Sequence, residues 1–323
     1  MIVIWAEGGK RIGSGHLNRS MDVFNILKGE FNVNFYAEDP ESIQFYRDRE
    51  IHVLKFDVLK NGNFFLITDL RFPEEHKNLK DIKKYALKHL SIHDMGLAQM
   101  DSDIKVDGHI KMLNEYQFED NKKYYLGPDY FLLKTKFRHF NKVRKKVKKK
   151  ARRIYLSLGG WSRLEDLRYF SELLLKEGFV LTISWGFGKS NRDRRLFRKN
   201  FPSVDIVTRG EFIPRKYYEA DIAILAGGIS FYEAACTGTP SLLFYKDEFQ
   251  KFTVNSFVEH GFGISAGNLF DFNENEFLEV LRNYKYDFEM RKNHSNAGKR
   301  MIDGLGLLRL KKIVEEEYDK LFK

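Results

Sequence analysis

The segment LAGGISFYE, residues 225–233, combines a strand end, two glycines and a helix start. The apolar run Ile222 to Leu225 predicts a buried parallel strand, and residues 231–236 predict a helix. A glycine turn between them gathers unpaired backbone N–H groups and the positive end of a helix dipole, which suits a phosphate or diphosphate. Such a glycine pair also occurs where a turn only needs tight packing, so the motif alone leaves both interpretations open.

Strand-like and helix-like segments alternate on both sides of this segment. Strands are expected at residues 2–6, 33–37, 64–68, 90–92, 104–106, 154–158, 180–185, 204–207, 222–225 and 241–244. Helices are expected at residues 15–29, 40–49, 81–88, 167–177, 212–219, 231–236 and 307–322. This βα alternation predicts an α/β fold in which mainly parallel sheets are covered by helices on both faces.

The length and composition indicate a two-domain protein without a membrane span. The chain has 323 residues, 43% of them hydrophobic, and domains average about 150 residues. No apolar run reaches the roughly 18 residues that a membrane helix needs, and the N-terminus does not read as a signal peptide. The single cysteine, Cys236, excludes an intramolecular disulfide and is expected to be a core residue. A cytoplasmic protein is predicted, with peripheral contact at the inner membrane face as an open alternative.

The net charge of +10 is concentrated in the basic segment Lys134 to Arg153. Such a run suits nucleic acid or an anionic membrane surface, and equally a solvated linker between two domains. No aromatic residues are interleaved with its densest part and no nucleic-acid-binding motif surrounds it. The linker interpretation is therefore favoured, and nucleic acid is not expected as a partner.

A second glycine turn, GGKRIGSGHLNR at residues 8–19, follows the first strand and enters a helix. It lacks the third glycine of a dinucleotide fingerprint, where Asn18 stands, and no Gly-Lys-Ser/Thr makes it a P-loop. It places His16 at the start of a helix, where a histidine can act as a general base near neutral pH. The alternative is a histidine that only hydrogen-bonds a loop.

Residues 13–19, GSGHLNR, resemble the GxGHxxR motif of the PseG/SpsG family of nucleotide-sugar enzymes in bacterial surface-glycan biosynthesis. These proteins have the GT-B fold and are related to the N-acetylglucosaminyltransferase of peptidoglycan synthesis. Further matches follow in the family's order over most of the chain. They are Thr68-Asp69, Asp94, Asp103, residues 127–133, Leu158-Gly159-Gly160, residues 226–233, Glu248-x-Gln250, Asn255 and Asp303-Gly304-x-Gly306.

The resemblance implies a role for each matching position. His16 would activate the attacking oxygen, and a UDP-linked sugar would be the substrate. Nucleotide and diphosphate contacts would come from Gly15, Gly159, Gly160, Ile213, Gly227, Gly228, Ser230 and Glu233, with Ile213 at the uracil and Glu233 at the ribose. Sugar contacts would come from Arg19, Asp69, Arg71, Glu248, Gln250 and Asn255. No metal or separate cofactor is implied, because backbone donors and a helix dipole would neutralise the diphosphate.

Three positions depart from the family pattern. Arg71 stands where the hydrolase of the pseudaminic acid pathway has a tyrosine, Phe249 replaces an asparagine, and Ile229 replaces a serine. The first two would face the sugar.

The resemblance predicts two Rossmann-type doubly wound domains with a cleft between them. The boundaries expected are 1–145, 151–300, and a C-terminal helix at 301–323 that packs back on the first domain. The leading interpretation is an inverting UDP-sugar hydrolase with His16 as base. The alternatives are an inverting glycosyltransferase, whose partner would be a glycan or membrane-linked acceptor, and a non-catalytic nucleotide-sugar-binding protein.

Overall fold

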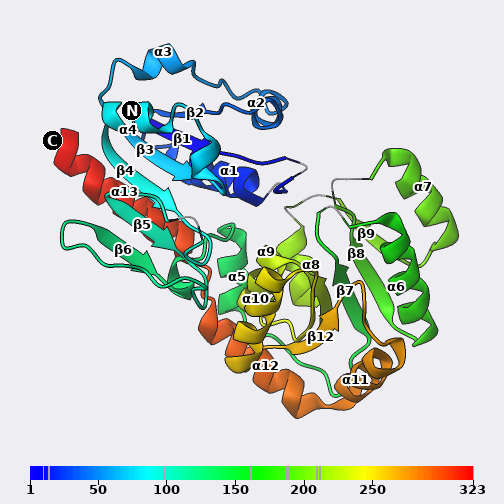
Figure 1. The fold of residues 1–323 in the computed structure, drawn as a ribbon. Helices are drawn as coiled ribbons and strands as arrows, with labels where there is room; N and C mark the ends of the chain where they lie inside the picture. The colour runs from blue at the N-terminus through cyan, green and yellow to red at the C-terminus, as the bar shows by residue number, and fades with distance from the viewer. Residues whose placement is uncertain are drawn as a thin grey trace. The chain divides into compact units, whose positions relative to one another are not determined.

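The computed structural model describes residues 1–9, 11–13, 15–97, 99–160, 162–186, 189–208, 210 and 212–322. The chain forms two compact units, Met1–Lys134 with Leu305–Lys323, and Thr135–Gly304 (Figure 1). The division lies at 134/135 rather than at residue 145, because helix α5 (Lys136–Lys142) packs on α8 and α9 of the second unit. The C-terminal helix α13 (Gly306–Phe322) belongs to the first unit.

Within the described ranges, the first unit holds a six-stranded parallel sheet in the order β2-β1-β3-β4-β5-β6. Its strands are β1 (Ile2–Ala6), β2 (Val33–Tyr36), β3 (Phe64–Asp69), β4 (Ala86–Ile92), β5 (Ile104–Asp107) and β6 (Lys123–Leu126). Its helices are α1 (Gly15–Leu27), α2 (Pro40–Arg47), α3 (Phe56–Leu59), α4 (Leu79–Tyr85) and α13, with short 3-10 turns η1 (Pro73–Glu75) and η2 (Pro128–Tyr130). Every residue of β1 and β3 is buried, as expected for strands covered on both faces.

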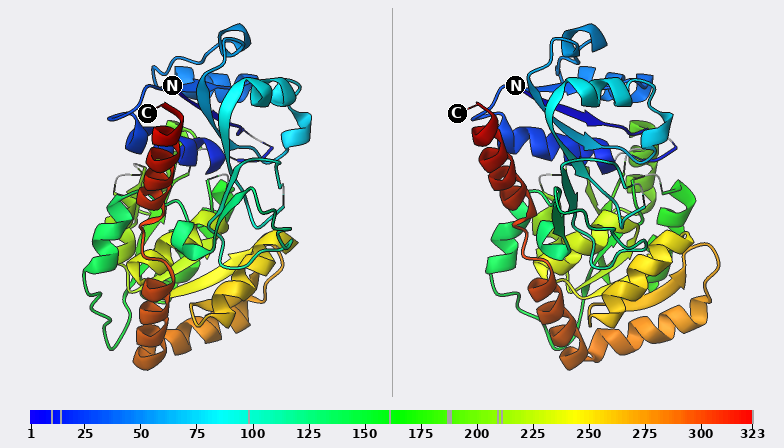
Figure 2. Two further views of the ribbon diagram at one scale, coloured as in Figure 1. Left: turned by 90° about the vertical axis from the view of Figure 1, so that its left-hand side faces the viewer. Right: turned by 60° about the vertical axis from the view of Figure 1, so that its left-hand side comes forward.

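Two helices from opposite ends of the sequence pack together in the first unit. Helix α13 lies beside α1, as both views of Figure 2 show, and α13 also contacts η2. Leu17 and Leu27 of α1 share a buried cluster with Leu310 and Val314 of α13. Gly306 allows the close approach to η2, because a Cβ there would lie 2.1 Å from the Phe131 carbonyl oxygen. The last helix is therefore part of the first unit's core.

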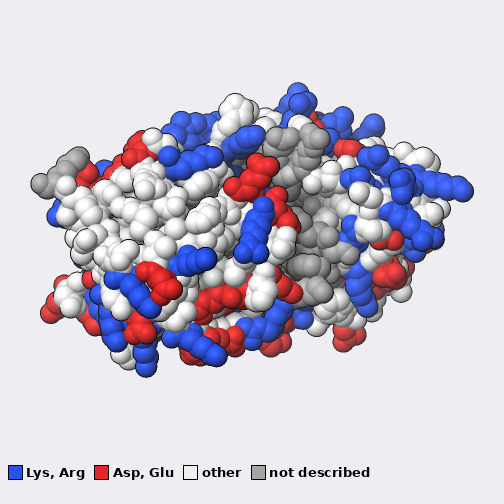
Figure 3. Space-filling view, turned by 90° about the horizontal axis from the view of Figure 1, so that it is seen from above, with Lys and Arg blue, Asp and Glu red and all other residues white. Residues whose placement is uncertain are grey.

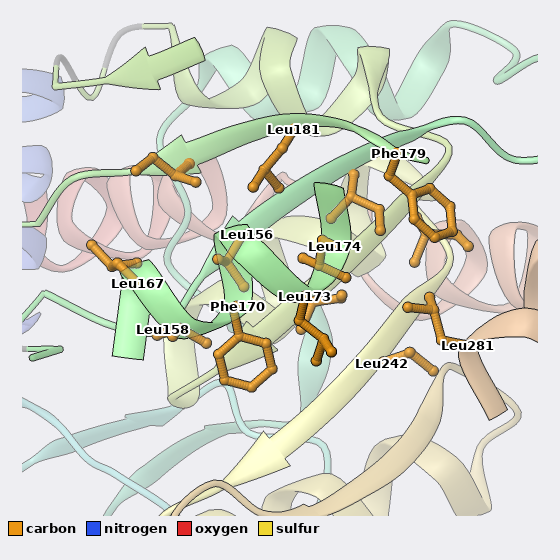
Figure 4. Packing of buried hydrophobic residues seen from close by; sticks show 14 of the residues in the cluster. Leu156, Leu158, Leu167, Phe170, Leu173, Leu174, Phe179, Leu181, Leu242 and Leu281 are labelled. Atoms are coloured by element: carbon orange, nitrogen blue, oxygen red, sulfur yellow. The ribbon is translucent and has the colours of Figure 1, made fainter. Parts of the chain in front are cut away.

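The second unit repeats this architecture, with a described six-stranded parallel sheet in the order β12-β11-β10-β7-β8-β9. Its strands are β7 (Arg153–Ser157), β8 (Val180–Ser184), β9 (Asp205–Val207), β10 (Ile222–Ala226), β11 (Ser241–Tyr245) and β12 (Ile264–Asn268). Its helices are α5, α6 (Leu164–Lys176), α7 (Asn191–Asn200), α8 (Ile213–Glu219), α9 (Gly228–Thr237), α10 (Glu248–Glu259), α11 (Glu274–Tyr286) and α12 (Phe288–Met301). Figure 4 shows side chains of β7, α6 and β8, such as Leu156, Phe170 and Leu181, packed in its core.

These two sheets confirm the predicted fold class, two Rossmann-type domains with helices around parallel strands. In the first sheet, β1 lies between β2 and β3, and in the second, β7 lies between β10 and β8. The strand order reverses at these points, where doubly wound folds bind ligands beyond the carboxyl ends of the strands. The glycine turns after β1, β7 and β10 all lie at such ends.

The structure differs from the sequence expectation at several elements, and the helices α3, α5, α10, α11 and α12 were not predicted. The helix expected to reach residue 88 ends at Tyr85, and β4 begins at Ala86. The strands β6 and β12 were not predicted, because both are sheet edges without a continuous buried run. Helix α7 was missed because Phe197 is its one buried residue, although the capping box between Ser190 and Asp193 signals its start.

The basic segment is partly tied to the second unit. The Lys145 ammonium donates to the carbonyl oxygens of Tyr217 and Tyr218 at 3.1 and 2.6 Å. The buried guanidinium of Arg291 donates to the carbonyl oxygens of Lys148 and Lys149, each at 2.9 Å. These contacts support a structural role for the segment.

The surface carries charges of both signs. On the face in Figure 3, acidic side chains lie among the more numerous basic ones. None of the helices described combines the length and the apolar character that crossing a membrane requires.

Replacing Arg291 with leucine is expected to lower the free energy of unfolding by about 2–4 kcal/mol, because four backbone carbonyl groups lose their donor. Urea denaturation of the purified variant measures this loss. The neighbouring exposed variant Lys292→Met removes one surface ion pair and should stay within about 0.5 kcal/mol of the parent. Equal losses in the two variants would contradict the role assigned to Arg291.

Candidate active site

His16 and Asp69 form a buried pair at the carboxyl edge of the first sheet. The turn after β1 closes through hydrogen bonds between Gly9 and Gly13, and α1 begins at Gly15, directly before His16. Asp69 is the last residue of β3 and pairs in register with Ala6 of β1. The two side chains meet with His16 Nδ1 2.7 Å from Asp69 Oδ1. Ser14 of the motif lies outside the described residues.

Arg19, one turn further along α1, joins this pair to Asp94. Its Nε and Nη2 donate to the two carboxylate oxygens of Asp69 at 2.7 and 2.6 Å, and its Nη1 donates to Asp94 Oδ1 at 3.1 Å. Asp94 follows β4, and its Oδ2 lies 3.4 Å from His16 Nε2. The imidazole therefore lies between two carboxylates. Arg71, just after β3, adds a longer contact to Asp94 at 3.5 Å.

The charges of this cluster shift the pKa values of its members. Burial alone would lower the pKa of His16, but the Asp69 and Asp94 carboxylates outweigh it, so the pKa of His16 is raised. Burial would raise the pKa of both aspartates, but Arg19 and His16 hold both pKa values below the usual range. Since Asp69 accepts from Nδ1–H, Nε2 is the ring nitrogen left to take up a proton.

Glu7, immediately after β1, fixes the loop that carries Arg71. Its Oε1 accepts from the backbone N–H groups of Arg71 and Phe72 at 2.6 and 2.9 Å, and its Oε2 lies 2.6 Å from His76 Nε2. Burial alone would lower the pKa of His76, but Glu7 and Glu38 raise it. The sequence prediction missed Glu7 and His76. Their only local signal is that Glu7 directly follows a buried strand.

In the second unit, three strand ends converge on the glycine turns. Gly159 and Gly227 have φ values of +88° and +106°, which favour glycine. A Cβ on Gly159 would lie 3.3 Å from the Ala226 carbonyl oxygen, so the turns after β7 and β10 are adjacent. A Cβ on Gly186, after β8, would lie 2.5 Å from the Gly160 carbonyl oxygen. Helix α9 then starts at Gly228, where a Cβ would meet open space.

Of the residues predicted to contact the nucleotide, Gly15 begins α1 in the first unit, and the others belong to the second unit. Ser230 is in the first turn of α9, and the half-buried Glu233 follows one turn later. Burial and the charge of Glu233 raise the pKa of the buried Tyr155 and Tyr217 phenols. Ile213 begins α8, with its N–H 3.4 Å from the Gly210 carbonyl oxygen, and Glu211 between them lies outside the described residues.

The three residues predicted to face the sugar from the second unit all lie on α10. Gln250 is half-buried and its Oε1 accepts from the backbone N–H of Lys246 at 3.1 Å. Glu248 is exposed and lies 3.4 Å from Lys251, and Asn255 is exposed further along the helix. Gln250 is thus tied to the end of β11, whereas Glu248 and Asn255 are open to solvent.

The histidine next to Asp94 has structural partners. His93 Nε2 lies 2.7 Å from Ser91 Oγ, and Nδ1 lies 2.7 Å from the Tyr116 hydroxyl. Burial lowers the pKa of His93 to about 4. Among the described residues, no group of three or more His, Cys, Asp or Glu side chains is arranged to hold a metal ion. Metal independence stays a prediction.

The two sheets and their glycine turns define a GT-B fold. The calicheamicin glycosyltransferase CalG4 aligns over 100% of both chains with a TM-score of 0.65 and 11% identity. MurG from Acinetobacter baumannii aligns over 98% of this chain and 99% of its own, with a TM-score of 0.58 and 12% identity. UDP-GlcNAc 2-epimerase from Neisseria meningitidis aligns over 99% and 100%, with a TM-score of 0.59 and 14% identity. At these identities the likeness shows the fold alone.

The sequence itself is similar to the spore coat polysaccharide biosynthesis protein SpsG of Bacillus subtilis (strain 168). The two are 24% identical over 340 aligned residues, which cover 98% of each chain. Protein MJ1062 of Methanocaldococcus jannaschii is 23% identical over 304 residues, 86% of this chain and 62% of that protein. No protein-family model matches the chain. The resemblance to the SpsG-like group is confirmed over nearly the full length, and the role of each site residue stays a prediction.

The pKa of His16 is expected to lie above its ordinary value of 6.5 and to fall in an Asp94→Asn variant, which removes one of the two carboxylates. NMR titration of the imidazole measures both. Because the folded-state pKa is raised, the stabilisation by protonated His16 is complete below the unfolded-state value and is lost as the pH rises through the folded value. An Asp101→Asn control, at an exposed carboxylate, should leave the His16 titration unchanged. An unchanged midpoint in Asp94→Asn would contradict the assigned electrostatics.

Proposed function

We propose that this chain is an inverting enzyme that moves a sugar from a nucleoside diphosphate to an attacking oxygen, with His16 as general base. The observation that carries the proposal is the buried contact of 2.7 Å between His16 Nδ1 and Asp69, at the carboxyl edge of a Rossmann-type sheet. It fixes the tautomer in which Nε2 can accept a proton. The GT-B fold and the full-length similarity to SpsG support a nucleotide sugar as the substrate class.

In the proposed reaction, His16 Nε2 removes the proton from a hydroxyl or water oxygen as that oxygen attacks the anomeric carbon. The new carbon–oxygen bond forms while the bond to the diphosphate breaks, and its electron pair leaves with the nucleoside diphosphate. A single displacement of this kind inverts the anomeric centre. Asp69 stabilises the imidazolium that forms, and Arg19 keeps the Asp69 and Asp94 carboxylates charged.

The second unit would bind the nucleotide. Backbone N–H groups at Gly159, Gly160, Gly227, Gly228 and Ser230 would hold the diphosphate, helped by the dipole of α9. Glu233 would bind the ribose, and backbone groups at Ile213 would bind the base, with uracil as the expected base.

Transfer to a glycan or lipid-linked acceptor is the form of the reaction that we favour. The similarity to a polysaccharide biosynthesis protein over 98% of each chain supports it. Arg71, at the position of a tyrosine in the related hydrolase, adds a cation that suits an anionic acceptor. Hydrolysis is the second candidate, because the GSGHLNR motif resembles one of the whole PseG/SpsG family, its hydrolase branch included.

A panel of UDP-sugars, incubated with and without candidate acceptors, separates these functions. UDP release that needs an acceptor supports transfer, and UDP release in water alone supports hydrolysis. Tight binding of a UDP-sugar without UDP release under either condition would instead support a non-catalytic binding protein and contradict the proposal.

A His16→Ala variant should release UDP about a hundred-fold to ten-thousand-fold more slowly than the parent, because the attacking oxygen loses its base. Coupled UDP detection measures the rate. The matched control is His52→Ala, at an exposed histidine of the same unit, which should keep the parental rate. A His16→Ala variant as active as the parent would remove the base assignment.

The value of kcat/KM should rise with pH and level off, with an apparent pKa above 6.5, because the free enzyme needs unprotonated Nε2 and two carboxylates favour the protonated ring. Initial rates at fixed ionic strength across the neutral to alkaline range measure this profile. A profile that falls across the same range would indicate that protonated His16 is the active form, which is inconsistent with its role as base.

A further inference from the structure

Two lysines from different strand ends hold the same glycine turn of the second unit. Lys246, directly after β11, donates from Nζ to the Leu158 carbonyl oxygen at 2.6 Å. Lys189, after β8, donates from Nζ to the Ser162 carbonyl oxygen at 2.8 Å and to its hydroxyl at 3.2 Å. Their ammonium groups therefore lie at Leu158, just before the Gly159-Gly160 pair that follows β7, and at Ser162.

Among the described residues, each carboxylate whose charge influences one of the two ammonium groups already has another partner. Asp166 influences both lysines but is held by Arg163, with Nη2 2.6 Å from Oδ1. Asp193 near Lys189 is engaged in the capping box of α7. Asp247 near Lys246 accepts from the Gln250 N–H at 2.8 Å. The positive charges are thus partnered mainly by neutral oxygen atoms.

This arrangement is electrostatically unfavourable as it stands. Burial lowers the pKa of both lysines, and the charge of Lys246 lowers the pKa of Lys189 further. Two like charges held on one turn by neutral acceptors gain stabilisation when an anion binds between or beside them. Within the described ranges, Lys246 uses one of its three N–H groups on Leu158, and Lys189 uses its N–H groups only on Ser162, so each ammonium has donor capacity toward a ligand.

The surroundings allow an anion to approach. A Cβ on Gly159 would lie 3.2 Å from Lys246 Nζ, so the absent side chain leaves the ammonium beside the backbone of the turn. The same Cβ would be 3.3 Å from the Ala226 carbonyl oxygen, directly before Gly227 and Gly228, where added Cβ atoms would meet nothing within 4 Å. The ammonium of Lys246 thus borders the open space at the start of α9.

We propose that Lys189 and Lys246 bind the diphosphate of the donor and stabilise its charge as the glycosidic bond breaks, which selects nucleoside diphosphates over nucleoside monophosphates. The inference rests on the proposed function and deepens it. The diphosphate gains a further negative charge when it leaves with the bonding electron pair. Two fixed cations at that position do the work that a bound divalent metal does elsewhere. A monophosphate would engage one ammonium and leave the other unneutralised.

The test is calorimetric titration of the full chain with UDP, UMP and inorganic pyrophosphate. The variants are Lys189→Gln and Lys246→Gln, with Lys292→Gln as a control at an exposed lysine of the same unit. Loss of one charge-assisted contact should weaken UDP and pyrophosphate binding by about ten-fold to a hundred-fold in each variant. UMP binding should change by less, and the control should bind all three ligands as the parent does.

Charge-preserving variants and thermal melts separate binding from folding. Lys189→Arg and Lys246→Arg should retain most of the UDP affinity, and a folded glutamine variant should melt cooperatively. If Lys246→Gln does not fold, UDP binding by Lys189→Gln alone tests the inference. That variant loses hydrogen bonds to one residue only, Ser162. Glutamine variants that bind UDP as tightly as the parent, or that lose UMP and UDP affinity equally, overturn the inference.

Failure of this inference can be distinguished from failure of the proposed function. If the parent releases UDP from UDP-sugars and the glutamine variants do so at the same rate, the function stands and the lysine assignment falls. If the parent binds pyrophosphate through both lysines but turns over no nucleotide sugar, the assignment stands and the function falls. Binding of neither UDP nor pyrophosphate by the parent overturns both.

Discussion

The Asp69 carboxylate is the group on which the candidate site depends. It is 1% exposed and accepts hydrogen bonds from Arg19 while it fixes His16. A buried carboxylate without its cation would be strongly unfavourable, and so would a buried guanidinium without its carboxylates. The pairing therefore links the first turn of α1 to the end of β3. Through Arg19 it extends to Asp94 at the end of β4. The parallel register of β1, β3 and β4 is what brings these three chain segments together.

The two units use one architecture for different chemistry. In the first unit, the strand ends carry charged side chains that hold one imidazole in a fixed orientation. In the second unit, the strand ends carry glycines, and the available groups are backbone N–H groups and lysine ammoniums. A fixed imidazole suits proton transfer, whereas N–H groups and cations suit an anion. This difference between the two units depends on their amino-acid sequences. In the second unit, for example, a side chain in place of Gly159 would contact the neighbouring turn.

The sequence predicts the parts of the fold that are buried on both faces. The strands β1, β3 and β10 contain continuous apolar runs, and the turns after β1 and β10 were found from their glycines. The family resemblance predicted His16 as the base and Arg19 and Asp69 as sugar contacts, and the structure brings these three residues into one buried cluster. The edge strands β6 and β12 were missed because they bury too little to leave a pattern. The contacts of Glu7 with His76 and of Lys246 with Leu158 were missed for another reason. They join residues 69 and 88 positions apart, and only the sheet order makes them neighbours.

The raised pKa of His16 opposes its proposed role as a base in one respect, since it lowers the unprotonated fraction near neutral pH. The same two carboxylates that raise the pKa also make Nε2 a stronger base once it is unprotonated, and they would stabilise the imidazolium that the proposed reaction produces. The loss of unprotonated His16 is small when its pKa lies near the working pH, whereas the stabilisation of the imidazolium would act on every turnover of the proposed reaction. Arg19 sets this balance, because its positive charge opposes protonation of His16 while its hydrogen bonds keep Asp69 and Asp94 ionised. The arginine of the motif therefore influences the basicity of the histidine both directly and through the two aspartates that it pairs with.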